Sequence, residues 1–557
     1  MDFQRTLLIG AIAVVGILTL QQWNEDYPGT TKSTSVVQSV SSSVAGSDMP
    51  SLHDGRDGST APVIDDGAAK PSAQLISVKT NTIEALIDPA GGDIISLSLP
   101  QYPSWLPEEG EQAVPFQLLV NSPDCQSDAT CVFTAQSALG KTDGPDANNL
   151  RSVYRVKQAS YTLEDGENKL TVDLHKNEDG IDVTKSYTFY RDQYDVSVNY
   201  TIVNNSDKVW RDQFYAQLKR DNSEDPSQLN SKAPMNTYLG AAVRSNDEPY
   251  TKLPFDDFSD KPFAERVQGG YAAMLQHYFV SAWIPDEQKA HQYYTKQNKD
   301  GYNFVGFYDD AMVAQPGETI ETGATLYVGP KNQEKLQALS DGLELTVDYG
   351  MLWFLAQPLF ALLTWIHSLV GNWGWSIILL TIMVKGIFYP LNATSFRSMA
   401  KMRKLGPRLA EMKEQFGDDR QKMSQSMMEL YKKEKVNPMG GCLPIVVQMP
   451  VFIALYWTLL ESVELRQAPW LGWIHDLSQM DPYFILPLIM GASMFIQQTL
   501  NPTPPDPVQA KVMKLMPVIF TFFFLFFPSG LVLYWVTNNT LSIIQQYFIT
   551  KKIEKEG

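Results

Sequence analysis

The chain has 557 residues, a formal net charge of −17 and three cysteines. Such an acidic chain is not expected to bind DNA, and three cysteines are too few for a disulfide scaffold or a cysteine-based metal site. The mean hydropathy of −0.20 conceals two unlike parts. Residues 24–350 are polar with a net charge of about −22, whereas residues 351–557 are rich in apolar residues and carry about +5, which indicates a water-exposed domain joined to a membrane domain.

Residues 1–23 are apolar almost without interruption from Thr6 to Leu20. Because bulky residues rather than a small-residue cleavage site follow Leu20, we predict an uncleaved signal-anchor helix rather than a cleaved signal peptide. Residues 24–72 are rich in Ser, Thr, Gly and Asp and are predicted to form a flexible linker.

Residues 73–345 contain alternating runs rich in Val, Thr, Tyr and Ile, such as KLTVDLHK and KSYTFYRDQYDVSVNYTIVNN. These runs predict antiparallel strands in a large all-β sandwich. His175, His277 and His291 lack a recognisable catalytic spacing, which favours a binding or scaffolding domain over an enzyme. Cys125 and Cys131 are close enough in sequence to form a disulfide in an oxidising compartment.

The C-terminal part is predicted to add five membrane spans to the anchor, at 373–391 (TM2), 443–462 (TM3), 483–500 (TM4), 512–527 (TM5) and 531–549 (TM6). The apolar segment 346–372 precedes the first of these without room for a turn. We therefore expect an amphipathic helix in the outer interface, with a seventh span as the alternative.

The segment 392–442 orients these spans. It holds eleven Lys or Arg against six Asp or Glu, so the positive-inside rule places it in the cytoplasm. The loop 501–511, the tail 550–557 and the N-terminus follow on the same side, and residues 24–350 lie outside.

Lys385 is the most informative single residue. It lies about five residues from Pro390, hence ~8 Å from the cytoplasmic end of its predicted span at about 1.5 Å per residue. At that depth an ammonium group usually faces the protein interior or a wet cavity, although it can also snorkel to the interface.

Polar residues on other spans favour the wet cavity. Gln448 lies at a similar depth, and Asn538, Ser542 and Gln545 recur at intervals of four and three on one helix face. Such a stripe either joins helices by hydrogen bonds or lines a groove open to the cytoplasm, and the combination with Lys385 favours the groove. Apolar side chains on adjoining spans, including Phe523, Tyr534 and Trp535, would guide the hydrophobic part of an incoming segment into lipid.

The cytoplasmic segment 392–442 is itself predicted to form a helical hairpin, with Asp418 as the N-cap of its second main helix. Methionines recur along it at helical spacing, among basic residues that suit ribosomal RNA or anionic lipid. The seam is either the core of the hairpin or a surface for hydrophobic clients; the residues concerned are Met399, Met402, Arg403, Lys404, Met412, Met423 and Met427.

Long stretches resemble a known family. The runs MAKMRKLGPRLAEM, VNPMGGCLPIVVQMPVFIALYWTLLESVELRQAPWLGWIHDLSQMDPYFILPLIMG and PVIFTFFFLFFPSGLVLYW are similar to the YidC family of bacterial membrane protein insertases, in its Gram-negative form. The resemblance implies an α-helical inner-membrane protein with six transmembrane helices, a five-helix core and a periplasmic β-supersandwich. It implies no catalytic activity and no cofactor.

The resemblance also implies partners and site residues. Clients would be nascent membrane proteins such as ATP synthase membrane subunits, inserted alone or with the Sec translocon and its accessory subunits. The ribosome, the signal-recognition-particle receptor and membrane lipids would be further partners. The family carries an arginine in its groove where this chain has Lys385, which keeps the charge but not the bidentate fork. Thr381, Gln448 and Trp535 fall at the groove and client-contact positions of the family.

Two other classes remain as alternatives at this point. A solute transporter would usually show internal repeats, and the spans show no self-similarity. A membrane-anchored periplasmic sugar-binding or sugar-processing protein would depend on the β domain for its activity.

Overall fold

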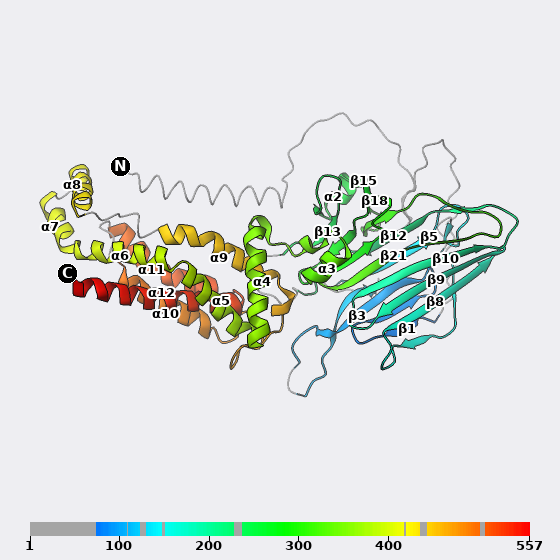
Figure 1. Cartoon of the computed structure of the whole chain (residues 1–557), viewed down its shortest axis with the longest axis horizontal. Helices are drawn as coiled ribbons and strands as arrows, with labels where there is room; N and C mark the ends of the chain where they lie inside the picture. The colour runs from blue at the N-terminus through cyan, green and yellow to red at the C-terminus, as the bar shows by residue number, and fades with distance from the viewer. Residues whose placement is uncertain are drawn as a thin grey trace, which may run out of the picture.

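The computed structural model describes residues 74–107, 110–122, 130–147, 151–227, 237–416, 419–434, 443–501 and 507–556. The expected anchor (1–23) and linker (24–72) lie outside these residues. The expected disulfide partner Cys125 also lies outside them, and Cys131 itself is disulfide-bonded. A β-rich half is followed along the chain by a helical half, and the two lie end to end (Figure 1).

Two large sheets form the β-rich half. The ten-stranded sheet contains Ile76–Lys79 (β1), Glu84–Asp88 (β2), Asp93–Pro103 (β3), Pro115–Asn121 (β4), Val132–Leu139 (β5), Ser160–Thr162 (β7), Phe214–Arg220 (β12), Ala264–Gln268 (β15), Ala290–Gln297 (β18) and Asn303–Tyr308 (β19). The nine-stranded sheet contains Arg155–Val156 (β6), Lys169–Glu178 (β8), Ile181–Tyr190 (β9), Asp195–Asn204 (β10), Gly240–Val243 (β13), Thr251–Leu253 (β14), Ala272–Leu275 (β16), Phe279–Ile284 (β17) and Thr319–Pro330 (β21). Trp210–Asp212 (β11) and Met312–Ala314 (β20) form a separate pair.

The strand orders are β15-β18-β19-β12-β5-β4-β3-β2-β1-β7 and β14-β13-β16-β17-β21-β10-β9-β8-β6. The pairings are antiparallel apart from β1 with β7, which is parallel. On β9 every second residue from Val183 to Phe189 is buried, which is the period expected of a strand with one face on the core. One continuous apolar core takes side chains from both sheets, for example Phe133 and Tyr187, so the half is a β sandwich.

The helices of the β-rich half and of the connection to the second half are Asp257–Asp260 (α2), Gln333–Leu339 (α3), Leu343–Thr346 (η2) and Gly350–Leu352 (η3). Those of the helical half are Trp353–Val370 (α4), Trp373–Ile387 (α5), Tyr389–Lys404 (α6), Gly406–Phe416 (α7), Arg420–Lys433 (α8), Leu443–Glu461 (α9), Val463–Leu465 (η5), Ile485–Leu500 (α10), Pro507–Phe524 (α11) and Ser529–Glu556 (α12).

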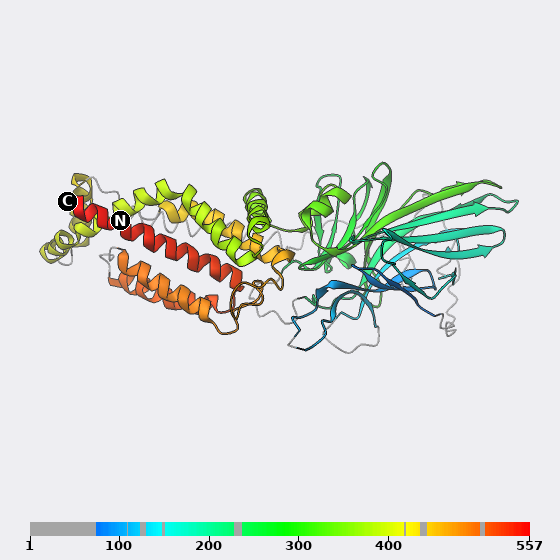
Figure 2. The ribbon, with the colours of Figure 1, turned by 60° about the horizontal axis from the view of Figure 1, so that its bottom comes forward.

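Helices α5, α9, α10 and α12 run along one common direction, and α4 lies across the end of this bundle that faces the sandwich (Figures 1 and 2). Helix α12 packs against α5, α6 and α10, whereas α11 packs mainly on α10. The shared apolar core of the bundle includes Leu380, Leu455, Met490 and Val532.

By length and composition, the described residues contain one helix able to cross a membrane alone, Gly350–Val370. The pair Trp373–Ile387 and Tyr389–Lys404, bent by 68°, passes the same test together. Val446–Glu461 and Ile485–Leu500 are shorter apolar helices. The one described helix that passes this test alone is thus in the segment that the sequence predicts to lie in the outer interface.

Candidate functional site: a polar cluster in the helical bundle

Lys385 lies in the last turn of α5 and points into the bundle, with 5% of its surface exposed. Its Nζ donates to Ser542 Oγ on α12 at 2.8 Å and lies 3.5 Å from Gln448 Oε1 on α9. Three predicted groove residues from three helices therefore meet at one point. The ammonium is held by neutral oxygens and has no carboxylate partner among the described residues, which leaves its charge available to an incoming acidic group.

Thr381 and Asn538 lie near Lys385 but, unlike Ser542, do not bond to its ammonium group in the described contacts. Thr381 lies four residues before Lys385 on the same face of α5, but its hydroxyl donates to the Ile377 carbonyl within the helix. The backbone carbonyl of Asn538 accepts a hydrogen bond from Ser542 Oγ at 2.8 Å. This bond orients the hydroxyl that accepts the hydrogen bond from Lys385 Nζ. Gln545, the third member of the predicted stripe, has a buried Oε1 without a partner in the described part of the chain.

Asn392 also contacts this polar cluster, although the sequence did not predict it. Its side chain is buried, its Oδ1 lies 3.4 Å from Gln448 Nε2, and its Nδ2 is buried without a described partner. The sequence placed Asn392 at the start of a cytoplasmic loop, whereas α6 continues the helical path immediately after α5. A polar residue two positions beyond Pro390 and seven beyond Lys385 was the available signal.

A second polar seam on α12 is separate from the groove. Asn539 donates to Ser493 Oγ at 3.2 Å, and Gln546 donates to the Leu500 carbonyl and to Asn501 Oδ1, all on the side of α10. Residues 539 and 546 are seven apart and share a helix face. These bonds join α10 to α12, so only part of the polarity of α12 is free to line a groove.

An aromatic cluster surrounds Trp535 of α12. Trp535 is seven residues from Ser542, hence ~10 Å away along α12 at about 1.5 Å per residue. Its ring contacts Phe452 of α9 at 4.3 Å and Phe524 of α11 at 5.2 Å between centroids, and Tyr534 stacks on Phe452 at 6.1 Å. Helices α9, α11 and α12 thus meet through rings at this level.

Phe523 has a different position from Tyr534 and Trp535. Its side chain is 53% exposed, and neighbouring Phe522 is also exposed, on the outward side of α11. Helices α9 and α11 have few contacts in the part of the chain that is described, apart from the aromatic cluster. The space between these two helices is therefore loosely packed apart from the rings.

The segment that the sequence predicts to be cytoplasmic contains the helices α6, α7 and α8, and α7 packs against α8. Met402 and Met427 pack on a small core of Leu405 and Tyr431. Met399, Met412 and Met423 are half-buried, and Arg403 and Lys404 are exposed, although Lys404 Nζ donates to the Ile553 carbonyl of the C-terminal helix. The methionine seam therefore serves in part as the core of the hairpin itself.

One local expectation for this hairpin was wrong. The side chain that caps α8 is Asp419, which accepts from the Lys422 backbone N–H at 3.1 Å. The expected cap, Asp418, lies outside the described residues. Both carboxylates are chemically suited to the role, and the sequence pattern does not distinguish adjacent aspartates.

The three histidines of the sandwich have structural partners. His175 Nδ1 bonds Thr184 Oγ1 across a strand pair, and His291 lies between Asp309 and the Asp286 carbonyl. His277 Nε2 bonds the Leu460 carbonyl at 2.9 Å, at the C-terminal end of α9, and burial lowers the pKa of its imidazole to about 3. A neutral His277 therefore connects the sandwich to the bundle.

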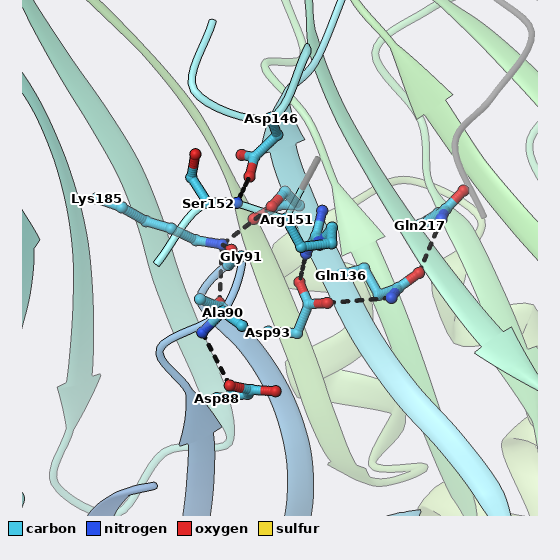
Figure 3. A network of polar contacts seen from close by, with 12 residues as sticks. Asp88, Ala90, Gly91, Asp93, Gln136, Asp146, Arg151, Ser152, Lys185 and Gln217 are labelled. Carbon is cyan, nitrogen blue, oxygen red and sulfur yellow. Dashed lines mark hydrogen bonds and ion pairs between the residues drawn. The ribbon is translucent and has the colours of Figure 1, made fainter. Parts of the chain in front are cut away.

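A buried network of charges occupies the sandwich core (Figure 3). Lys185 Nζ donates to the carbonyls of Gly91, Gly92 and Ser137 at 2.8–3.0 Å, so all three of its protons are used. Arg151 pairs with Asp93, which also accepts from Gln136. Within the described residues no group of His, Cys, Asp or Glu is placed to hold a metal ion. The network is satisfied internally, which is the pattern of a structural element.

Comparisons with known proteins cover both halves. The family model described as "60Kd inner membrane protein" matches residues 365–556, and the one described as "YidC periplasmic domain" matches residues 75–362. Proteins named "Membrane protein insertase YidC" from Azotobacter vinelandii and Pseudomonas aeruginosa are each 52% identical, over 100% of this chain and 99% of theirs. The one from Stutzerimonas stutzeri is 53% identical over the same shares.

Solved structures give more distant likenesses. The structure titled "Active YidC insertase crystal structure with the first transmembrane domain resolved" is 17% identical with a TM-score of 0.37, covering 86% of this chain and 93% of its own. A galactose mutarotase related enzyme from Lactobacillus acidophilus is 12% identical with a TM-score of 0.30, covering 46% of this chain and 97% of its own.

Proposed function

Because the chain belongs to the YidC family of bacterial inner-membrane protein insertases, we infer that the groove around Lys385 is where it receives the membrane proteins that it inserts. Its function is membrane protein insertion, and it is not an enzyme with covalent chemistry. The solute transporter and the sugar-processing protein are therefore no longer needed as alternatives. The convergence of Lys385, Gln448 and Ser542 in a buried position is the observation that carries the assignment of the site.

The proposed mechanism shortens the hydrocarbon that a client must cross. The polar leading end of the client enters the groove from the cytoplasm, where Lys385 attracts its carboxylates and Gln448, Asn392 and Ser542 exchange hydrogen bonds with its backbone. The hydrophobic segment then leaves between α9 and α11, along exposed side chains such as Phe523. Burial of apolar surface at ~25 cal/mol per Å² drives this transfer, so no nucleotide is needed.

The aromatic cluster has a role in this proposal. Phe452, Phe524 and Trp535 close the groove toward the outer face, so water and ions cannot follow its polar surface across the bundle. A passing client has to displace ring contacts worth about 0.5–1.5 kcal/mol each beyond area burial. These contacts are weak enough to open and re-form in each insertion event.

The proposed topology has six transmembrane helices with both termini in the cytoplasm and the sandwich in the periplasm. In this topology α4 lies in the outer interface rather than across the membrane. Its crosswise orientation at the end of the bundle supports this (Figures 1 and 2), as do its exposed residues Trp353, Phe354, Trp365 and Leu369, which suit the headgroup boundary.

The proposal extends to partners through the exposed basic residues of the cytoplasmic hairpin. We expect the ribosome and the signal-recognition-particle receptor to bind there, and the Sec translocon with its accessory subunits to accept larger clients from the bundle. ATP synthase membrane subunits are expected clients for insertion by this protein alone.

Photocrosslinking tests the location of the site. A photoreactive residue at Gln448 is expected to crosslink a stalled acidic-tailed client, and one at Leu488, on the lipid-facing side of α10, is the matched control. Crosslinks to Leu488 without crosslinks to Gln448 would place the client outside the groove and contradict the assignment.

A further inference from the structure

We propose that Asn392 is a specificity-determining residue for insertion, whose side-chain N–H group donates a hydrogen bond to backbone carbonyl oxygens of the client. This assignment rests on the proposed function and refines it by dividing the recognition of the client between two residues. Lys385 attracts acidic side chains, whereas Asn392 binds the main chain and therefore serves clients of any charge.

The chemistry of the neighbouring groups fixes which way the Asn392 amide points. An ammonium group can only donate, so the atom of Gln448 that lies 3.5 Å from Lys385 Nζ is the carbonyl oxygen Oε1. Gln448 Nε2 is then turned toward Asn392, and the atom that faces it at 3.4 Å is the acceptor Oδ1. Rotating either amide by half a turn would oppose two donors or two acceptors. Asn392 Nδ2 therefore points away from Gln448.

This Nδ2 group is a buried donor that is not used within the described part of the chain. The Asn392 side chain belongs to a residue that is only 3% exposed, and its Nδ2 has no hydrogen-bond partner among the described residues. The backbone N–H of Asn392 is already bonded to the Phe388 carbonyl at 3.0 Å, so the side chain carries the free donor. A buried N–H without an acceptor destabilises the folded protein, which an apolar side chain at this position would avoid. The donor therefore points to a ligand that supplies an acceptor.

A backbone carbonyl is the acceptor that fits this donor best. Every residue of a client carries one, and carbonyls that are not yet paired within a client helix need a partner when they leave water. Carboxylates are drawn instead to the ammonium of Lys385, because a charged donor bonds them more strongly than a neutral amide does. The contacts from Lys385 to Gln448 and from Gln448 to Asn392 also polarise the last N–H in the series, which strengthens it as a donor.

The position of Asn392 suits a contact made early in insertion. It lies in the first turn of α6, directly after the 68° bend between α5 and α6. Since α5 runs toward the cytoplasm in the proposed topology, a client that enters from that side reaches Asn392 beside Lys385. Between clients a water molecule can satisfy the Nδ2 group and is then displaced by the carbonyl.

Insertion into liposomes by full-length variants tests the assignment. The two clients are one with an acidic tail and a twin whose tail carboxylates are replaced by amides. Asn392→Leu is expected to slow both clients by the same factor, about twofold to tenfold, which is the range for one neutral hydrogen bond. Lys385→Met should slow the acidic client alone. Asn392→Asp keeps an acceptor for Gln448 but has no N–H, so it should match Asn392→Leu on the neutral twin.

Thermal stability separates this role from a structural one. Because Asn392→Leu removes a buried donor without a described partner, its melting temperature should be unchanged or higher while insertion slows. The matched control is Asn539→Leu on α12, which removes a buried amide that donates to Ser493 Oγ at 3.2 Å. The control is expected to lower the melting temperature and to leave insertion by the folded protein unchanged.

Normal insertion of the neutral twin by Asn392→Leu or by Asn392→Asp overturns the assignment, because the Nδ2 donor is then not used. A fall in both insertion and melting temperature on Asn392→Leu also overturns it, since Asn392 is then a structural residue. In both cases an acidic client that is still impaired by Lys385→Glu leaves the proposed function standing. Loss of the Lys385→Glu effect together with the Asn392→Leu effect overturns both.

Discussion

Reversing the charge of Lys385 is the sharpest perturbation of the groove. At about 4 Å a carboxylate and an ammonium attract each other by ~1 kcal/mol in bulk water and by ~4 kcal/mol at an effective dielectric constant of about 20. Removing the charge with Lys385→Met is therefore expected to slow insertion of an acidic-tailed client by about fivefold to several hundredfold. Lys385→Glu turns the attraction into repulsion and should be worse, whereas Lys385→Arg keeps the charge and should retain most activity.

The assay is insertion into liposomes by the purified variants, with one client carrying an acidic outer tail and a twin whose tail carboxylates are replaced by amides. Ser542→Ala is the matched control, because it removes the 2.8 Å hydrogen bond but leaves the charge. Equal activity of Lys385→Glu and Lys385→Arg, or equal impairment of the acidic client and its neutral twin, would refute the role of charge attraction.

Three further predictions concern other parts of the molecule. Lys185→Ala leaves three backbone carbonyls without their donor and should lower the unfolding free energy of the sandwich by about 3–5 kcal/mol in denaturant melts, while insertion by the bundle changes little under native conditions. Burial raises the pKa of Glu464 to about 7; the folded state therefore binds an extra proton between the unfolded value near 4.5 and about 7, and stability falls as pH rises through that window. Glu464→Gln should remove the contribution of this carboxyl, seen as a smaller drop in melting temperature between pH 5 and pH 8, and an unchanged drop would count against it. Gly491 packs so closely on Thr521 that an added side chain would clash, so Gly491→Val should separate α10 from α11 and lower the melting temperature of the bundle, with the exposed Leu488→Val as the control.

The sequence predicted the strands in which buried and more exposed residues alternate. β9 and β10 bury every second residue because one face packs on the core and the other is more open. β5 reads VFTAQSAL and is buried at all eight positions, and β17 is buried throughout, so neither shows the period of two. The polar residues of β5 are buried because Gln136 and Ser137 belong to the network around Asp93 and Lys185.

The residues around Lys385 were predicted only in part, because sequence gives the depth of a residue along a span but not how the helices pack. The position of a residue along its span indicates its depth, and Lys385, Gln448 and Ser542 are predicted at similar depths. Their contacts agree with this prediction. Which face a polar residue presents is readable only within one helix. The division of α12 between a groove side and an α10 side, with Asn539 and Gln546 on the latter, depends on how helices pack and was not predicted.

The most direct test of the account is insertion of a small two-span client into liposomes that contain only this protein, scored by protease protection. The account predicts protection well above that of empty liposomes, with loss of protection for the acidic-tailed client on Lys385→Glu. Client binding without any protection would contradict the central claim, because it would make the protein a chaperone that depends on a separate translocon.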